Sequence, residues 1–121
     1  MFCSCNRVSS NHILLKTCYD GDTCTIKMHG NYHSMRIINI DAPEINGDCK
    51  LERIKAIQSR DFLNNMIKKA KVYTVILEEE KDYYGRFLGD IRIDGIHVSK
   101  YLIWMGKAKK YKKNIDWCAV A

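Results

Sequence analysis

Hydrophobic and polar residues alternate along several short stretches of this chain, and this pattern predicts β-strands. The clearest stretch is residues 23–28, where Cys24 and Ile26 lie on one face and polar residues lie on the other. Residues 29–31 (HGN) follow it as a hairpin turn signal. Four further stretches are apolar or β-branched and are bounded by turn residues: residues 12–19, 34–40, 72–77 and 88–93. Together with residues 23–28 they make five predicted strands.

Apolar residues at helical spacing predict a long helix at residues 51–70 and a short helix at residues 100–105. In the long segment the apolar side chains fall on a single face: Ala56, Phe62, Leu63, Met66, Ile67 and Ala70. Lysines at the end of this segment complement the helix dipole. For the short helix, Ser99 is the expected N-cap and Gly106 the expected C-cap.

Two turn signals separate the strands in the second half of the chain. Residues 78–86 (EEEKDYYGR) are predicted to form a charged turn, and Asp94-Gly95 is predicted to close a hairpin with a short return at residues 96–98. The predicted order is three strands, a helix, two strands and a short helix. This order indicates an α+β, mainly β protein: a five-stranded Greek-key barrel of the OB-fold type, with one long and one short packed helix.

The net charge of +6 and an isoelectric point near 9.0 favour a polyanionic partner, and nucleic acid is the first choice. The excess is greatest in residues 100–113, which carry six lysines and no acid. Taken alone, this run is equally compatible with a solvated lysine-rich tail. No apolar run is long enough for a membrane span. The N-terminal residues lack the basic-then-apolar order of a secretory signal, so an intracellular location is favoured, with export by another route left open.

The six cysteines are expected to be mostly reduced thiols: Cys3, Cys5, Cys18, Cys24, Cys49 and Cys118. An even number permits a disulfide framework, but the missing secretory signal and a core of ordinary size argue against the need for one. Cys3 and Cys5 lack the C-x-x-C spacing of common zinc sites, and no second pair follows them.

Carboxylates gather between Tyr19 and Glu44, around two of the predicted strands. Asp22 and Asp41 each lie at a strand end beside a turn, where their side chains can converge on one ion. Oxygen ligands alone favour a hard cation such as calcium or magnesium. The alternative is that these aspartates, together with Asp20, only cap turns.

Two arginines supply positive charge near these acids. Arg36 is a lone cation in an apolar strand and therefore requires a partner; the plain structural alternative is a buried ion pair with Glu44 or Asp41. Arg86 follows a tyrosine and a glycine at the end of the charged turn. Two guanidinium groups are suited to hold a phosphodiester and the charge that it gains during attack. Glu44, which follows a proline, is then a natural group to activate or orient a water molecule.

Three ordered motifs resemble the staphylococcal nuclease (thermonuclease) family: DGDT at residues 20–23, MRIINIDAPE at 35–44 and DYYGR at 82–86. The C-x-x-E start of the long helix, formed by Cys49 and Glu52, agrees with that family, as do Asp94-Gly95 and the segment 99–108. The resemblance covers about residues 12–110, and three ordered motifs are more specific than any one of them.

The resemblance implies an OB-fold and a calcium-dependent phosphodiesterase that hydrolyses DNA and RNA and leaves 3′-phosphate ends. We expect single-stranded or frayed substrates and a monomer. The implied site residues form three groups: Asp22, Asp41 and the carbonyl of Ala42 for Ca²⁺, Arg36, Arg86 and the general base Glu44 for catalysis, and Tyr84, Tyr111 and Lys109 for substrate binding. The alternative is a non-catalytic nucleic-acid-binding OB-fold module, and the complete catalytic set argues against it.

The chain departs from the family in two places. Tyr83 stands where a lysine often precedes the Tyr-Gly-Arg motif, so a phosphate contact is lost or replaced. Residues 112–121 are too short to supply the family's C-terminal helix, although the lysines of residues 109–113 can compensate by charge. Trp104 and Trp117 are expected to pack rather than to bind bases. The expected divisions are a flexible lead-in at residues 1–11, a thermonuclease-like OB-fold domain at 12–111 and a short basic, irregular tail at 112–121.

Overall fold

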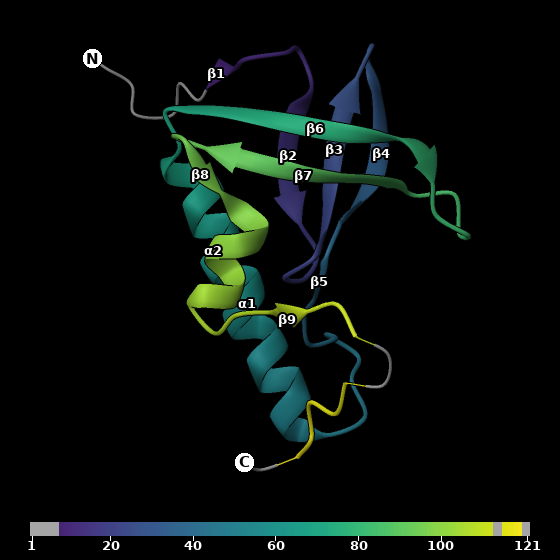
Figure 1. Ribbon diagram of the computed structural model, residues 1–121, viewed down its shortest axis with the longest axis vertical. Helices are drawn as coiled ribbons and strands as arrows, with labels where there is room; N and C mark the ends of the chain where they lie inside the picture. Colours follow the sequence, from purple (N-terminus) through teal and green to yellow (C-terminus); the bar gives the residue numbers. More distant parts are fainter. Residues whose placement is uncertain (1–7, 113–114, 120–121) are drawn as a thin grey trace.

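A computed structural model describes residues 8–112 and 115–119 (Figure 1). Most of the expected lead-in, with Cys3 and Cys5, lies outside the described residues. The described elements follow in chain order: β1 (Val8–Ser9), β2 (Leu14–Cys18), β3 (Thr23–Met28), β4 (Asn31–Ile37), β5 (Ile40–Asp41), α1 (Lys50–Lys69), β6 (Val72–Lys81), β7 (Phe87–Ile93), β8 (Ile96–His97), α2 (Val98–Trp104) and β9 (Lys109–Lys110).

Five longer strands, β2, β3, β4, β6 and β7, form the body of one sheet. The hydrogen-bonded order is β1-β6-β7-β4-β3-β2, and β8 pairs with β7. β4 and β7 run parallel, whereas the β2–β3, β3–β4 and β6–β7 pairs are antiparallel. The sheet curls, so that β6 and β7 cross over β2, β3 and β4 (Figure 1). This curled, mainly β fold with two helices confirms the predicted OB-fold; β8 is the predicted return after Asp94-Gly95, whereas β1, β5 and β9 are two-residue strands that were not predicted separately.

Side chains near β2 form hydrogen bonds with β6, close to the two ends of the curled sheet. The backbone N–H of Leu15 donates to Tyr73 Oη at 3.0 Å, and Asn11 Nδ2 donates to the carbonyl of Val75 at 2.7 Å. Leu15 and Val75 are fully buried and belong to the single core that the curl encloses. The contact between β2 and β6 is therefore stabilised by side-chain hydrogen bonds and by packing in the core.

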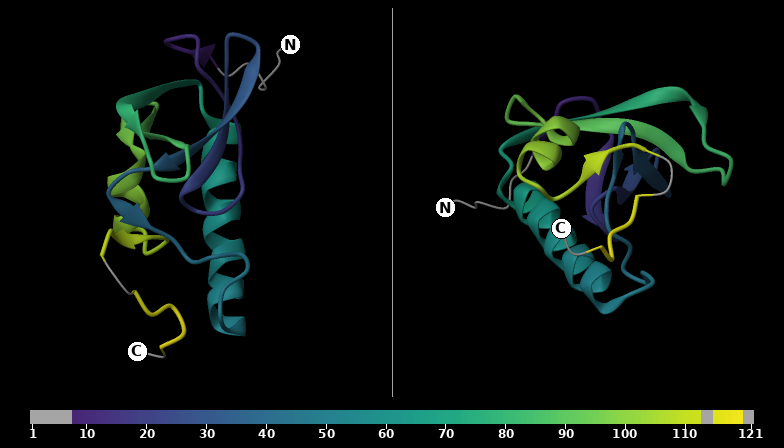
Figure 2. Two further views of the ribbon diagram at one scale, coloured as in Figure 1. Left: turned by 90° about the vertical axis from the view of Figure 1, so that its right-hand side faces the viewer. Right: turned by 60° about the horizontal axis from the view of Figure 1, so that its bottom comes forward.

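The two helices cover the open part of this core (Figure 2). On α1, Ala56, Leu63 and Ile67 are buried, which confirms the predicted apolar face. Asn64 of α1 binds both the N–H and the carbonyl of Cys18, at 2.8 and 3.0 Å, and so fixes the helix to the end of β2. α2 packs against β7. Among the described residues, neither helix is both long and apolar enough to cross a bilayer.

The predicted charged turn at residues 78–86 is too long, because β6 continues to Lys81. After an irregularity in register, Lys81 pairs with Phe87 across the ladder, and its Nζ lies 4.5 Å from the centroid of that ring. Charged side chains on a two-stranded ribbon remain solvated, so the run of acids does not end the strand. The true turn occupies residues 82–86.

The short helix also differs from its prediction. α2 begins at Val98, and Ser99 lies inside it, where its Oγ donates to the buried carboxylate of Asp90 at 2.8 Å. Because this buried acceptor takes the hydroxyl, Ser99 does not act as the expected N-cap. Trp104 is 78% exposed, so the expectation that it packs is wrong, whereas Trp117 is buried as predicted.

Two disulfides overturn the expectation of reduced thiols. Cys18 and Cys24 are direct partners in the β2–β3 register, and they are bonded to each other. Cys49, at the N-cap of α1, is bonded to Cys118, which is 69 residues away in the chain. The described part of the chain contains no free cysteine. Strand pairing brings Cys18 to Cys24, and the end of α1 brings Cys49 to Cys118.

Residues 109–112 and 115–119, which we call the C-terminal arm, run back across the lower end of the molecule (Figure 1). β9 pairs antiparallel with β5, so that Lys109 lies opposite Asp41. The N–H of Tyr111 donates to the carbonyl of Asn39 at 2.9 Å. The disulfide at Cys118 then fastens the end of the arm to α1.

Candidate active site

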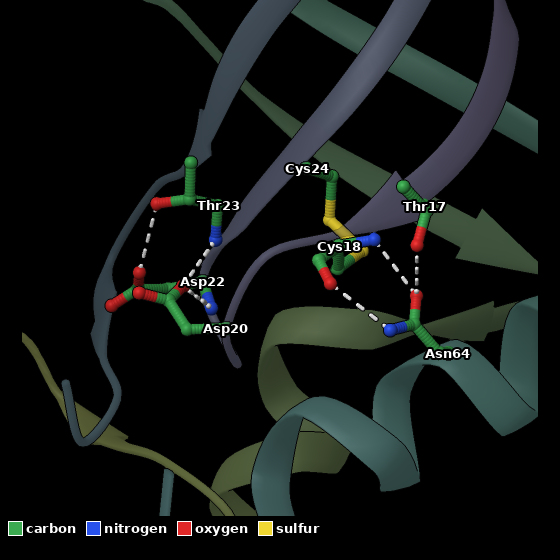
Figure 3. Close-up of a disulfide and its surroundings, with 7 residues drawn as sticks. All are labelled: Thr17, Cys18, Asp20, Asp22, Thr23, Cys24 and Asn64. Carbon is green, nitrogen blue, oxygen red and sulfur yellow. Dashed lines mark hydrogen bonds between the residues drawn. A yellow bond between two sulfur atoms is a disulfide. The ribbon is translucent and has the colours of Figure 1, made fainter. Parts of the chain in front are cut away.

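The DGDT motif forms a tight loop between β2 and β3 (Figure 3). Asp20 Oδ1 accepts from the N–H groups of Asp22 and Thr23, at 3.1 and 2.9 Å, so Asp20 caps the turn as the structural alternative expected. The disulfide between Cys18 and Cys24 closes this loop. A Cβ on Gly21 would lie 2.9 Å from the Cβ of Ala42, so only glycine permits the loop to lie this close to residue 42.

Asp22 points from this loop towards the other expected site residues. It is 1% exposed, and its Oδ2 accepts from the N–H of Ala42 at 2.8 Å. The same oxygen lies 3.3 Å from Arg36 Nη1. Thr23 is the partner of Arg36 in the β3–β4 ladder, so the strand register brings the acid and the guanidinium together.

Arg36 joins two of the acids. Its Nη2 lies 3.6 Å from Asp41 Oδ1, and its side chain is 17% exposed. Its Nη1 also donates to the carbonyls of Ile37 and Ile40, at 2.8 and 3.1 Å. Of the two partners considered from the sequence, Asp41 is therefore a contact, and the pair with Asp22 was not predicted.

Negative charge exceeds positive charge around Arg36. Burial, followed by the charge of Asp22, raises the pKa of Asp20 to about 8. Burial and then Asp22 raise the pKa of Asp41 as well. Burial, followed by Asp22 and Asp41, raises the pKa of Glu44 in the same way. In each case carboxylates repel one another in a partly desolvated place, and a bound cation would relieve that repulsion.

Glu52 fixes the loop that carries Glu44. It is 7% exposed, and its two carboxylate oxygens accept from the N–H groups of Glu44 at 3.0 Å and Asp48 at 3.3 Å. A Cβ on Gly47 would lie 2.4 Å from Glu52 Cδ, so the loop closes directly over this side chain. From the sequence, Glu52 was placed only in the C-x-x-E start of the long helix, without a contact. Its position three residues after the N-cap Cys49, as in a capping box, was the available signal.

Arg86 is held at the tip of the β6–β7 hairpin by Asp82. The carboxylate of Asp82 accepts from the N–H groups of Tyr84 and Arg86, at 2.9 and 2.8 Å, and from Arg86 Nε at 2.7 Å. Gly85 has φ +80°, which the tight turn requires and which glycine adopts without strain. Because Nε makes the ion pair, the two terminal nitrogens of Arg86 have no hydrogen-bond partner among the described residues.

A cavity of about 500 Å³ lies between this hairpin tip and the segment that joins β4 to β5. Arg36, Arg86, Tyr84 and Tyr111 all line it, so the structure brings these four expected residues to one place. Asp22, Asp41 and Glu44 are not among its lining residues, although Asp22 and Asp41 both contact Arg36. Lys109 does not line it: its Nζ lies 4.8 Å from the centroid of the Trp117 ring.

Comparison with known proteins agrees with the sequence resemblance. Residues 34–118 match the family model described as Staphylococcal nuclease homologue. Two proteins named "Uncharacterized endonuclease", from Escherichia coli O157:H7 and from Escherichia coli, are each 30% identical over 95 residues, which is 78% of this chain and 57% of theirs. An uncharacterized protein of Methanocaldococcus jannaschii is 28% identical over an alignment of length 119, which covers 80% of this chain and 58% of that protein. The chain thus spans less than two thirds of the length of these curated relatives.

Proposed function

Because the chain belongs to the family of staphylococcal nuclease homologues, we propose that it is a nuclease that hydrolyses phosphodiester bonds in DNA and RNA. The observation that carries this proposal is the cavity of about 500 Å³ in which Arg36 and Arg86 meet beside the acids. The printed names of the two Escherichia coli relatives support the same class of activity. Cleavage would leave a 3′-phosphate and a 5′-hydroxyl.

In this proposal the two arginines bind the scissile phosphate. The free terminal nitrogens of Arg86 donate to its oxygens and stabilise the charge that develops during attack. Arg36, which also lines the cavity, neutralises the same charge, while its contacts with Asp22 and Asp41 hold it in place. Glu44 accepts a proton from the attacking water, and its raised pKa brings it closer to the range of an effective general base.

The acids fit a hard divalent cation, and we propose Ca²⁺. The donor set is oxygen only, and the raised pKa values of Asp41 and Glu44 mark an excess of carboxylate charge. Asp22, Asp41 and the carbonyl of Ala42 would hold the ion. Among the described residues no three His, Cys, Asp or Glu side chains form a metal site, so water and substrate would complete the coordination. When bound, the cation adds positive charge and polarises a phosphoryl oxygen.

The substrate in this proposal is a single-stranded or frayed strand bound by a monomer. Tyr84 and Tyr111 are 79% and 64% exposed at the cavity, where each can stack on an unpaired base. Lys109 would contribute charge along the C-terminal arm rather than inside the cavity.

A binding-only module is the second candidate. It is favoured by the lack of a three-residue metal-ligand cluster among the residues that the structure describes. Such a module would bind single strands through the same arginines and tyrosines and would leave them intact.

Digestion of single-stranded and duplex oligonucleotides separates the two candidates. The proposal expects cleavage with calcium, loss of cleavage with a chelator, and products that a polymerase extends only after phosphatase treatment. Glu44→Gln should lower the rate by about 10²- to 10⁴-fold, whereas Glu79→Gln, an exposed acid on β6, should leave it unchanged. Binding without cleavage in calcium, in magnesium and in manganese would favour the binding-only module.

A further inference from the structure

Tyr83, beside Tyr84 at the tip of the β6–β7 hairpin, is 95% exposed, yet it lines the same cavity as the two arginines. Together with Tyr84, which is 79% exposed, it forms an exposed aromatic pair beside these arginines.

The turn that carries Tyr83 is well fixed. The carboxylate of Asp82 accepts from the N–H groups of Tyr84 and Arg86. The N–H of Gly85 donates to the carbonyl of Asp82 at 3.0 Å. The ring of Tyr83 meets the ring of Tyr84 edge to face, with centroids 5.4 Å apart and planes at 87°. The Tyr84 ring in turn lies 5.7 Å from the Arg86 guanidinium carbon. The two rings therefore present surfaces at a defined angle beside the phosphate-binding arginines.

We propose that Tyr83 is a second base-stacking site, which binds the unpaired base next to the nucleotide that Tyr84 and the arginines hold. This inference rests on the proposed function, because it takes a nucleic acid strand as the ligand. Stacking needs the open face of a base, which a duplex hides and a single strand offers. Tyr83 therefore gives the cavity a preference for single strands.

Nucleic acid fits the surroundings of Tyr83 better than a protein partner does. The ring is two residues from Lys81 and three from Arg86, and the cavity wall that it shares contains Arg36. Stacking in combination with nearby guanidinium groups is the pattern of single-strand binding surfaces. An apolar protein partner would have to cover the terminal nitrogens of Arg86 without giving them an acceptor, which is unfavourable.

The test is fluorescence anisotropy with a labelled oligothymidylate, with chelator present so that the strand stays intact. Tyr83→Ala should weaken binding by roughly 5- to 100-fold, the range for loss of one stacked base, and Tyr83→Phe should retain wild-type affinity. The slope of binding against salt should not change in Tyr83→Ala, because no phosphate contact is lost. Tyr32→Ala is the matched control, since Tyr32 is 61% exposed on β4 and does not line the cavity.

A set of probes with one abasic position distinguishes stacking from a structural effect. For one position of the abasic site, the probe should bind the wild-type protein more weakly than the intact strand does. Tyr83→Ala should bind that probe and the intact strand with the same affinity. Equal affinity of wild type and Tyr83→Ala for every strand would overturn the inference, because Tyr83 would then contribute nothing to binding of a nucleic acid strand. An equal loss on duplex and single strand, with a changed salt slope, would also overturn it. These outcomes concern binding alone, so they remain separate from a failure of the wild-type protein to cleave.

Discussion

Asp22 holds Arg36 and Ala42 with a single carboxylate oxygen. That oxygen accepts from the Ala42 N–H at 2.8 Å and lies 3.3 Å from Arg36 Nη1. Asp22 comes from the loop before β3, Arg36 from β4 and Ala42 from the segment after β5. The contact therefore joins three separate parts of the fold at the edge of the cavity, and the geometry of the site depends on it.

Arg36→Ala is expected to destabilise the protein as well as to impair the site. The substitution leaves Asp22 and Asp41 without the cation that lies between them, and removing one partner from a largely buried pair costs about 3–5 kcal/mol. Urea denaturation measures the loss in the free energy of unfolding. Arg92→Ala, at an exposed arginine of β7, is the control and should change it little. A loss below about 1 kcal/mol for Arg36→Ala would contradict the buried-pair account.

Glu52→Ala should impair cleavage indirectly, through Glu44. It leaves the partly buried N–H groups of Glu44 and Asp48 without an acceptor, which lowers the free energy of unfolding by about 1–3 kcal/mol. Glu52→Gln keeps one of the two acceptor oxygens, so with its oxygen towards Glu44 it should restore part of the stability and most of the cleavage rate. If Glu52→Gln is as inactive as Glu52→Ala while fully stable, the charge of Glu52 matters, and the positioning role is wrong.

Removal of the disulfide between Cys49 and Cys118 should cost more stability than removal of the one between Cys18 and Cys24. The chain-entropy model gives about 4 kcal/mol for the bond with 69 residues of separation and about 2 kcal/mol for the bond with six. Cys49→Ser with Cys118→Ser should also weaken strand binding, because the C-terminal arm carries Tyr111 to the cavity. Thermal melting and anisotropy measure both effects. Equal melting temperatures for the two double variants would contradict the ranking.

Asp94 should make stability dependent on pH in the acid range. Hydrogen bonds from the N–H groups of Val72 and Lys71 lower the pKa of Asp94 in the folded state. A lowered folded-state pKa gives stability that is present above the unfolded value of about 3.9 and is lost as pH falls through the folded value. Asp94→Asn should therefore flatten the decrease in unfolding free energy below about pH 4. Asparagine also tolerates the φ of +50° at this turn. An unchanged slope against pH would contradict the assignment.

Local patterns in the sequence predicted the parts of the fold that local forces determine. Residues 23–28 form β3 as expected, and the apolar face of the long helix is the buried face of α1. The three motifs that resembled the nuclease family were sufficient to predict the OB-fold. Motif order carries this information because each motif lies at a strand end or a turn.

Long-range contacts were not predictable in the same way. Cys49 and Cys118 meet only because β9 pairs with β5 and leads the arm back to α1. Ser99 does not cap α2, because its hydroxyl donates to the carboxylate of Asp90 on β7. The role of Glu52 likewise depends on how closely the loop around residue 47 folds over it. Each of these features depends on packing between segments that are distant in the chain or irregular in conformation.

The most direct test of the central claim is the cleavage rate of Arg86→Ala on a single-stranded oligonucleotide in calcium. Arg86 is partly exposed and pairs only with Asp82 among the described residues, so its loss should leave the fold intact. The account predicts that the rate falls by about 10²- to 10³-fold, as expected when one donor to a developing charge is removed. Arg92→Ala should cleave at the wild-type rate. Full activity in folded Arg86→Ala would contradict the assignment of this cavity as the site of phosphodiester hydrolysis.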